Sequence, residues 1–167
     1  FPESLIQVIA GNPKVCKHIH LPLQAGNDRV LDRMNRHYTG ADYMALVARL
    51  RKACPSIALT TDVIVGFPTE TGEEFEDTLR IMREVAFDAA FIFKYSVRPN
   101  TSAAKKFKDD VSEEVKTDRI VRLNKLQTEI SLTRNKAEVD QVQQIMIERV
   151  DTDKGGAAYG RNDANKI

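Results

Sequence analysis

The stretch IALTTDVIVGF, residues 57–67, decides the fold class. Val, Ile, Leu and Thr dominate it, and Asp62 is its one charged residue. A short, nearly uncharged run that is rich in β-branched residues is typical of a parallel strand covered on both faces. We therefore expect this stretch to be a central strand of an α/β domain.

Strand and helix patterns alternate on both sides of this stretch. One further strand is predicted at 15–24 and another at 89–96. Helices are predicted to begin at Asn27, at Thr39 and at Thr71, the last two with an acidic residue at the third position, as in a capping box. This order of strands and helices predicts parallel α/β architecture with right-handed crossovers.

The chain changes character in its C-terminal third. Ser112 is predicted to cap a long helix that runs to about Asn135. Two strand patterns then flank the loop DTDKGGA at 151–157, as in the first part of a small β domain. We therefore divide the chain into an α/β domain at 1–137 and an incomplete β domain at 138–167.

Composition restricts the classes of function. The 167 residues carry 25 Lys and Arg against 24 Asp and Glu, so binding of nucleic acid by overall charge is excluded and any basic surface must be local. No apolar run reaches the ~18 residues of a membrane span, and we expect no secretory signal before Phe1. Two cysteines do not form a disulfide framework. We expect a cytoplasmic protein.

The histidines and cysteines are candidate metal ligands or nucleophiles. His18 and His20 alternate on a predicted strand and so face the same side. Without a Cys or carboxylate at a metal-binding spacing nearby, local packing or hydrogen bonding is favoured over metal binding. Cys16 and Cys54 are interpreted as small apolar residues, because neither has an assignable base partner. We predict no metal ligand in this chain.

Polar clusters follow the predicted strands, at the carboxyl ends where parallel sheets place ligand sites. They lie at 24–26, 66–69 and 95–98. The second cluster could also form only a tight turn. Asp62 has two open interpretations, an internal structural carboxylate or part of a ligand site, because a buried carboxylate needs hydrogen bonds or a cation. These residues by themselves indicate an α/β scaffold that binds an unknown ligand.

Three segments carry a resemblance to one family: HIHLPLQAGNDRVLDRMNRHYT at 18–39, TTDVIVGFPTETGEEFEDTL at 60–79 and FKYSVRPNTSAA at 93–104. In this order and spacing they resemble the radical S-adenosylmethionine (SAM) methylthiotransferases. The resemblance is strongest to the branch that adds a methylthio group to isopentenyladenosine beside the tRNA anticodon. The final YGRNDANKI, at 159–167, is similar to the GR…NK stretch of the RNA-binding TRAM domain that ends these enzymes.

The resemblance implies a fold and a SAM site. Residues 1–137 would form the later half of a TIM-like radical SAM barrel with a long C-terminal helix, and 138–167 a truncated TRAM-like domain. Arg36 would hold the SAM carboxylate, since a planar guanidinium matches its two oxygens; the alternative is a cation near the end of a helix. The other implied SAM contacts are Gln24 and Asp62 to the ribose, and Gly66, Phe67, Tyr95 and Ser96 around the adenine.

Two loop positions depart from the family. Thr69 and Asn100 stand where relatives commonly have Gly. Asn tolerates a positive φ, so Asn100 is compatible with the same turn. Thr69 leaves the conformation of its loop open.

The resemblance also implies two 4Fe–4S clusters and an electron donor protein. Relatives hold one cluster with a CxxxCxxC motif and the other on an N-terminal domain, and Cys16 and Cys54 match neither set. We therefore expect the chain to be a fragment, with no catalytic residue of its own and inactive by itself. An isolated half-barrel leaves strand edges open, so a dimer or a domain swap is also expected.

The substrate is inferred from the same resemblance. Arg98 with Pro99 favours the tRNA branches over the branch that modifies a ribosomal-protein aspartate. Threonylcarbamoyladenosine in tRNA is the nearest alternative substrate, and a non-catalytic RNA-binding module is the alternative of another class. Contacts to tRNA are assigned to Arg98, Arg161 and Lys166. The basic residues of the long helix are interpreted mainly as a solvated charged face, with a phosphate contact as the alternative: Lys116, Arg119, Arg122 and Lys125.

Overall fold

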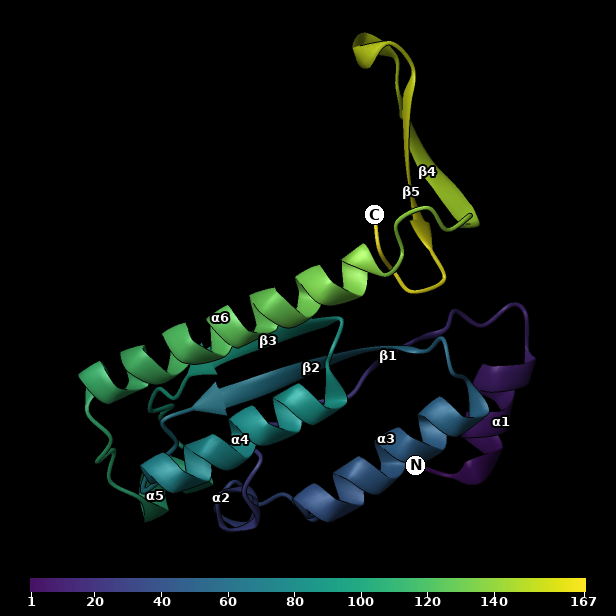
Figure 1. Cartoon of the computed structure of the whole chain (residues 1–167). Coiled ribbons are helices and arrows are strands. Elements are labelled where there is room, and N and C mark those ends of the chain that lie inside the picture. The colour runs from purple at the N-terminus through teal and green to yellow at the C-terminus, as the bar shows by residue number, and fades with distance from the viewer.

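The computed structural model describes residues 1–167, apart from the side chain of Lys154. It consists of an α/β part followed by a β-hairpin (Figure 1). The elements are α1 (Glu3–Gly11), β1 (His18–His20), α2 (Asp28–Arg33), α3 (Gly40–Ala53), β2 (Ala58–Val65), α4 (Gly72–Val85), β3 (Ala89–Lys94), α5 (Ser102–Lys106), α6 (Glu113–Lys136), β4 (Ile145–Asp151), the 3-10 helix η1 (Thr152–Lys154) and β5 (Ala157–Asn162).

The first three strands form one parallel sheet in the order β1-β2-β3. This confirms the predicted alternation of strands and helices. β1 is shorter than the predicted strand at 15–24, because the chain leaves the sheet after His20 and returns at Gln24 for a single bridge to Val63. The sheet therefore brings the segments that follow β1, β2 and β3 to one end, as a parallel sheet does.

Helices cover only one face of this sheet. Leu59, Val63 and Val65 of β2 are fully buried in a core that α3, α4 and α6 complete (Figure 1). On the opposite face of β3, Phe91 and Phe93 are 58% and 52% exposed. The prediction that β2 is covered on both faces is therefore wrong. Buried residues alternate with half-buried ones along β2. Because the half-buried residues include the apolar Ile64, the sequence alone does not predict that this face is open.

The helix starts follow the predicted caps. The Asn27 side chain accepts hydrogen bonds from the first turn of α2. Thr39 and Thr71 each form a complete capping box, with Asp42 and with Glu74. Ser112 accepts from the backbone N–H of Val115 at the start of α6. Each cap satisfies backbone donors that a helix start leaves free, which fixes where these helices begin.

The basic residues of α6 have two different environments. Lys116 and Arg119 are 3% and 6% exposed, so the interpretation of a solvated charged face is wrong for both. They lie on the same side of the helix as the buried Leu123 and Gln127, and internal carboxylates pair with them. Arg122 is exposed and pairs with Glu76.

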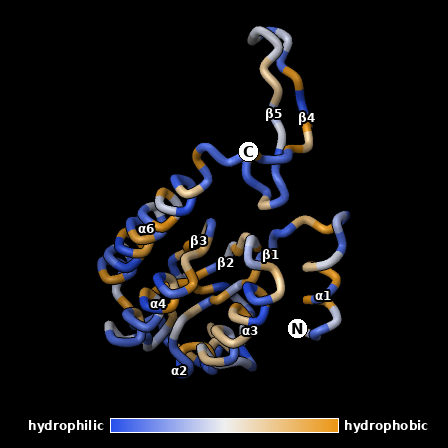
Figure 2. The backbone as a smooth tube through the Cα atoms, turned by 45° about the vertical axis from the view of Figure 1, so that its right-hand side comes forward, coloured by the Kyte–Doolittle hydropathy of each residue, from blue (hydrophilic) through white to orange (hydrophobic). Residues whose placement is uncertain are grey.

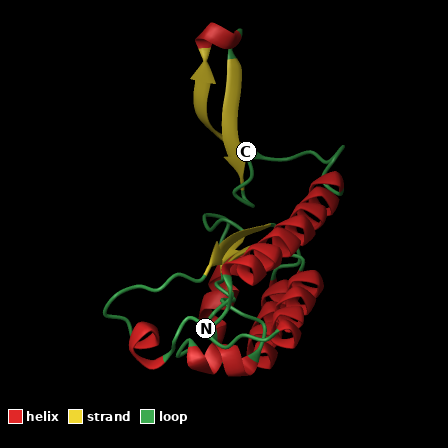
Figure 3. Cartoon of the chain, turned by 90° about the vertical axis from the view of Figure 1, so that its left-hand side faces the viewer, coloured by secondary structure: helices red, strands yellow, loops and turns green.

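The chain ends in an antiparallel β4–β5 hairpin with a register shift between Ile147 and Arg149. The hairpin stands apart from the helices (Figure 3), and much of β4 is hydrophobic and exposed (Figure 2). Gly160 permits the close pairing, because an added Cβ would lie 2.2 Å from the carbonyl oxygen of Met146. The two predicted strands are confirmed, while their assignment to a TRAM domain stays a prediction. Among the helices that the structure describes, none is both long and apolar enough to cross a membrane.

Candidate functional site

A cavity of about 660 Å³ lies beyond the carboxyl ends of β2 and β3, next to α2 and α5. Five of the seven residues predicted to bind SAM line it, together with Arg98 from the predicted tRNA contacts. This is the edge at which parallel sheets bind ligands. The predicted residues that the structure brings together here are Gln24, Arg36, Phe67, Tyr95, Ser96 and Arg98.

Gln24 holds a strained position at the base of this cavity. Its backbone φ is +66°, a value that residues other than Gly rarely adopt, and the residue is 7% exposed. Its backbone N–H donates to the Asp62 carbonyl at 2.8 Å, and its own carbonyl accepts from Ile64 at 2.9 Å. These bonds fix the backbone, so the side-chain amide is presented at a defined place.

Arg36 is joined directly to Gln24. Its Nη2 donates to the Gln24 Oε1 at 3.1 Å, and its backbone N–H donates to the Leu31 carbonyl at 2.9 Å, just after α2. Arg36 makes no ion pair with any carboxylate that the structure describes. An exposed guanidinium that is oriented by an amide can donate hydrogen bonds to a carboxylate or phosphate of a ligand.

Three aromatic rings form one wall of the cavity. The Phe67 ring meets Tyr95 edge-on at 5.1 Å and Phe107 at 6.0 Å between centroids. The Tyr95 hydroxyl is buried without a hydrogen-bond partner among the described residues. Burial and the nearby Asp109 carboxylate raise the pKa of Tyr95, so the phenol stays protonated. A buried hydroxyl without a partner indicates that a ligand or water completes its hydrogen bonding.

Gly66 and Asp62 lie outside the set of residues that line the cavity. Gly66 has a φ of +70°, and an added Cβ would lie 2.4 Å from the Lys116 Cγ. The absence of a side chain at Gly66, in the turn between β2 and α4, thus permits the close approach of α6. Asp62 projects on the open face of the sheet, where its Oδ2 lies 3.3 Å from the His20 Nε2. Asp62 is therefore half-buried beside a histidine, and its contact with SAM stays a prediction.

Two buried ion pairs support the aromatic wall from behind. Lys116 Nζ donates to both carboxylate oxygens of Asp109, at 2.7 and 2.6 Å, and lies 5.6 Å from the Tyr95 ring centroid. Arg119 Nη1 donates to Glu70 Oε2 at 2.6 Å. These pairs position the segments that carry Phe67 and Tyr95. The sequence held one signal for them, since Lys116 and Arg119 share the helical spacing of the buried residues of α6.

Glu70 connects the second ion pair to the turn after β2. The Gly66 N–H donates to the Glu70 Oε2 at 2.6 Å. Burial raises the pKa of Glu70, while this N–H and Arg119 act against that rise. The carboxylate therefore ties α6 to the turn that presents Phe67.

His18 and His20 do face the same side, as predicted. His18 Nε2 and His20 Nδ1 lie 3.1 and 3.0 Å from the Thr60 hydroxyl. Partial burial lowers the pKa of His18. Nowhere in the described part of the chain do three or more His, Cys, Asp or Glu side chains gather as a metal site would require.

The predicted tRNA contacts occupy different environments. Arg98 is exposed in the loop after β3. Arg161 Nε pairs with Glu148 across the hairpin at 3.3 Å. Lys166 Nζ lies 2.5 Å from Glu138 and 3.2 Å from Asp88, so it connects the C-terminal segment to the segment after α6 and to the residue before β3. Of these three residues, only Arg98 lines the cavity. The sequence did not indicate the ion pairs of Arg161 and Lys166.

Comparisons with known proteins agree with this arrangement. The radical SAM superfamily model matches residues 2–82. The solved structure titled "Coproporphyrinogen III oxidase (HemN) from Escherichia coli is a Radical SAM enzyme" superposes with a TM-score of 0.58 at 26% sequence identity, covering 68% of this chain and 27% of that one. The α/β part is therefore a radical SAM fold.

Curated relatives extend over almost the whole chain. The tRNA-2-methylthio-N(6)-dimethylallyladenosine synthase of Pelotomaculum thermopropionicum is 47% identical over 99% of this chain and 37% of that protein. The protein of the same name from Geotalea uraniireducens is 47% identical over 100% of this chain and 38% of that protein. The chain thus spans little more than a third of the length of these relatives, and along that span it belongs to the radical SAM methylthiotransferase family.

Proposed function

We propose that the protein containing this chain adds a methylthio group to C2 of N6-isopentenyladenosine in tRNA by radical SAM chemistry. The observation that carries the proposal is the 47% identity along the whole chain to relatives named for that product. Such agreement, hairpin included, favours the same substrate. We assign the protein to the cytoplasm, where this tRNA is found.

The residues of the cavity fit SAM. Arg36 would bind the methionyl carboxylate with its guanidinium fork, and Gln24 would orient Arg36 and reach the ribose. Phe67 and Tyr95 would pack on the adenine, with the free Tyr95 hydroxyl as a hydrogen-bonding group and Ser96 at the edge. When bound, SAM would supply the methyl group and the radical chemistry. The part of this chain is to bind, orient and partly desolvate it.

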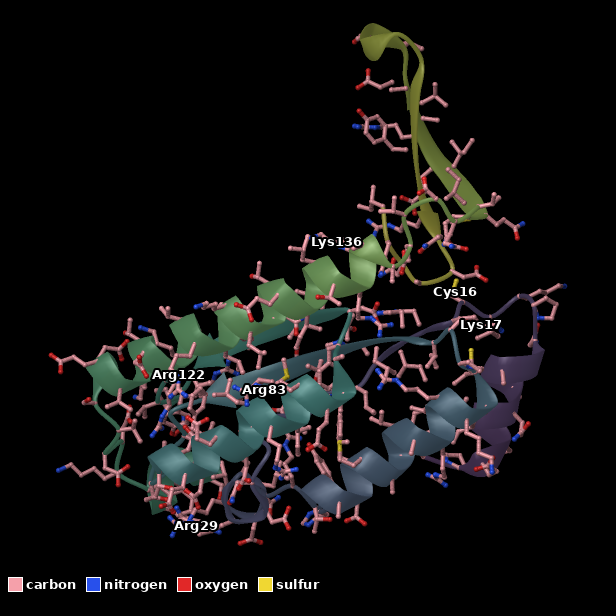
Figure 4. All side chains as sticks on the ribbon, in the orientation of Figure 1. Cys16, Lys17, Arg29, Arg83, Arg122 and Lys136 are labelled. Atoms are coloured by element: carbon pink, nitrogen blue, oxygen red, sulfur yellow. The ribbon has the colours of Figure 1, made fainter. Side chains whose placement is uncertain are left out.

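The residues present do not fit an iron–sulfur cluster. The chain has two cysteines, and a 4Fe–4S cluster is held by several thiolates at one centre. Cys16 is exposed in the loop before β1 (Figure 4), and Cys54 is buried at the end of α3. We propose that both clusters, and the docking site of their electron donor, belong to other parts of the protein. The chain by itself is then inactive.

The open sheet face supports a place in a larger barrel. We propose that residues 1–137 form the later part of that barrel, with further strands beside the present sheet, where Asp62 and Gly66 complete the SAM site. Residues 138–167 would begin the TRAM-like domain and contact the anticodon stem-loop through Arg161 and Lys166. A chain prepared alone would pair its open edges as a dimer or domain swap.

The test uses the complete protein, reconstituted without oxygen and given SAM, reductant and isopentenyl-modified tRNA. Mass spectrometry of the digested RNA should show a methylthio gain on isopentenyladenosine. A gain only on threonylcarbamoyladenosine, or only on a ribosomal-protein aspartate, would retain the chemistry and refute the substrate. No gain on any of these, with both clusters intact, would refute the proposed activity.

A further inference from the structure

Three basic side chains from three segments surround the mouth of the cavity. Arg33 ends α2, Arg98 lies in the loop after β3, and Lys106 ends α5. We call these three residues the basic rim. α2 and α5 lie at the same end of the α/β part (Figure 1), and the Arg33 guanidinium lies 5.2 Å from the ring centroid of Phe107, just past α5. The fold therefore gathers these cations although the sequence separates them.

The rim has no carboxylate partner. Other cations of this chain are neutralised by carboxylates, as Arg29 is by Glu74 and Arg134 by Asp88. Within the described residues, no member of the rim makes an ion pair. Asp32 is the single carboxylate in the lining of the cavity. In a chain of almost balanced charge, this is a local excess of positive charge.

SAM does not account for this excess. SAM has one carboxylate, which Arg36 can bind, and its ammonium and sulfonium groups give it a net positive charge. Further cations around SAM would repel it unless another anion is present. An anionic ligand beside the SAM position would balance the rim.

The surroundings of the rim match the chemistry of RNA. Arg98 and Lys106 are exposed, so a polymer can reach them, and Phe107 offers a ring beside Arg33. Cations interleaved with aromatic rings are the common means of binding single-stranded nucleic acid, through phosphate contacts and base stacking. An unpaired anticodon loop presents both groups.

We propose that Arg33, Arg98 and Lys106 bind backbone phosphates of the substrate RNA next to the reacting nucleotide, with Phe107 as a stacking surface for a neighbouring base. This inference rests on the proposed function, because it takes the substrate to be RNA. It assigns to the barrel itself a role in holding the RNA, separate from the C-terminal hairpin. The contacts position the RNA and carry no sequence information.

The test measures binding of an isopentenyl-modified anticodon stem-loop to the complete protein by fluorescence anisotropy over a series of KCl concentrations. The rim variant carries Arg33→Gln, Arg98→Gln and Lys106→Gln. Each lost phosphate contact lowers the slope of log K against log salt by about 0.7, so the rim variant should show a slope shallower by about 2 and roughly tenfold weaker binding or more. Inorganic phosphate is titrated as a competitor, and at equal ionic strength it should displace the RNA no more than KCl does.

A control removes three exposed cations outside the cavity lining, Arg83→Gln, Lys52→Gln and Lys14→Gln (Arg83 is labelled in Figure 4). The control should keep the wild-type slope, and all three proteins should bind S-adenosylhomocysteine equally. Equal slopes for the rim variant and wild type, equal losses in rim and control variants, or no RNA binding by the wild type would each overturn the proposal. Rim-dependent binding without methylthiolation would refute the proposed function and leave the rim standing.

Discussion

Gly66 shows how one residue links the core to the cavity. Its φ of +70° is unfavourable for any residue with a Cβ, and that Cβ would overlap the Lys116 side chain. We expect Gly66→Ala to lower the free energy of unfolding by about 2 kcal/mol or more, because the strained backbone costs about 1–2 kcal/mol and Lys116 must also move. Urea denaturation of this chain measures the change. Gly72→Ala is the control, since nothing lies near its added methyl group, and an equal loss there would refute the explanation.

Replacing Arg36, unlike replacing Gly66, should leave the stability of the fold unchanged. It is exposed and bonded only to Gln24 and to its own local backbone. A hydrogen-bonded charge contributes about 1.5–3 kcal/mol, so Arg36→Gln should weaken S-adenosylhomocysteine binding to the complete protein by roughly 10- to 150-fold. Isothermal titration calorimetry gives the affinity. Arg36→Lys should recover only part of it, because an ammonium lacks the planar fork. Unchanged affinity in Arg36→Gln would exclude the carboxylate contact.

Helix α4 combines a cap with an ion pair that responds to pH. Hydrogen bonds from Arg29, at 2.5 and 2.6 Å, are the main cause that lowers the pKa of Glu74 below 4.5, helped by the Thr71 cap. A lowered carboxyl pKa adds stability above the unfolded pKa, and this is lost as pH falls through the folded pKa. Glu74→Gln should therefore cost about 1 kcal/mol at pH 7 and less than that at pH 3. Urea denaturation at both pH values tests it, with Glu73→Gln, an exposed residue of the same turn, as the control. A loss of equal size at both pH values would contradict it.

The elements also show what local sequence can predict. Helix starts such as Thr39 and Thr71 were predictable, because a cap depends on residues within one turn of each other. The open face of β2 was not predictable, because whether a face is covered depends on which elements pack against it. The apolar Ile64 is compatible with either a covered or an open face. The burial of Lys116 was not predictable for the same reason, since its half-buried partner Asp109 lies in an irregular segment. In the site, the strand-end clusters were predictable from topology, but the His20 contact of Asp62 was not.

One basic residue makes several contacts at the junction of the two parts of the molecule. A two-stranded hairpin is marginal in isolation, so contacts to the α/β part must help to hold it. Lys166 contacts Asp88 and Asn135 of the α/β part, and Glu138 just after α6. Arg134 also pairs with Asp88 and would remain after Lys166 is lost. We therefore expect Lys166→Met to free the hairpin without weakening the sheet.

Hydrogen–deuterium exchange distinguishes these effects. In Lys166→Met, amides of β4 and β5 and of the segment after Lys136 should exchange faster, while those of β2 should keep their protection. Arg149→Gln is the control, because it removes the cation–π contact with the Tyr159 ring inside the hairpin and leaves the contacts of Lys166 intact. Faster exchange in β2, or identical hairpin exchange in Lys166→Met and wild type, would show that Lys166 is not the joint. If it is the joint, an RNA phosphate that competes for Lys166 would also loosen the hairpin, so RNA binding and hairpin position would be coupled through this single side chain.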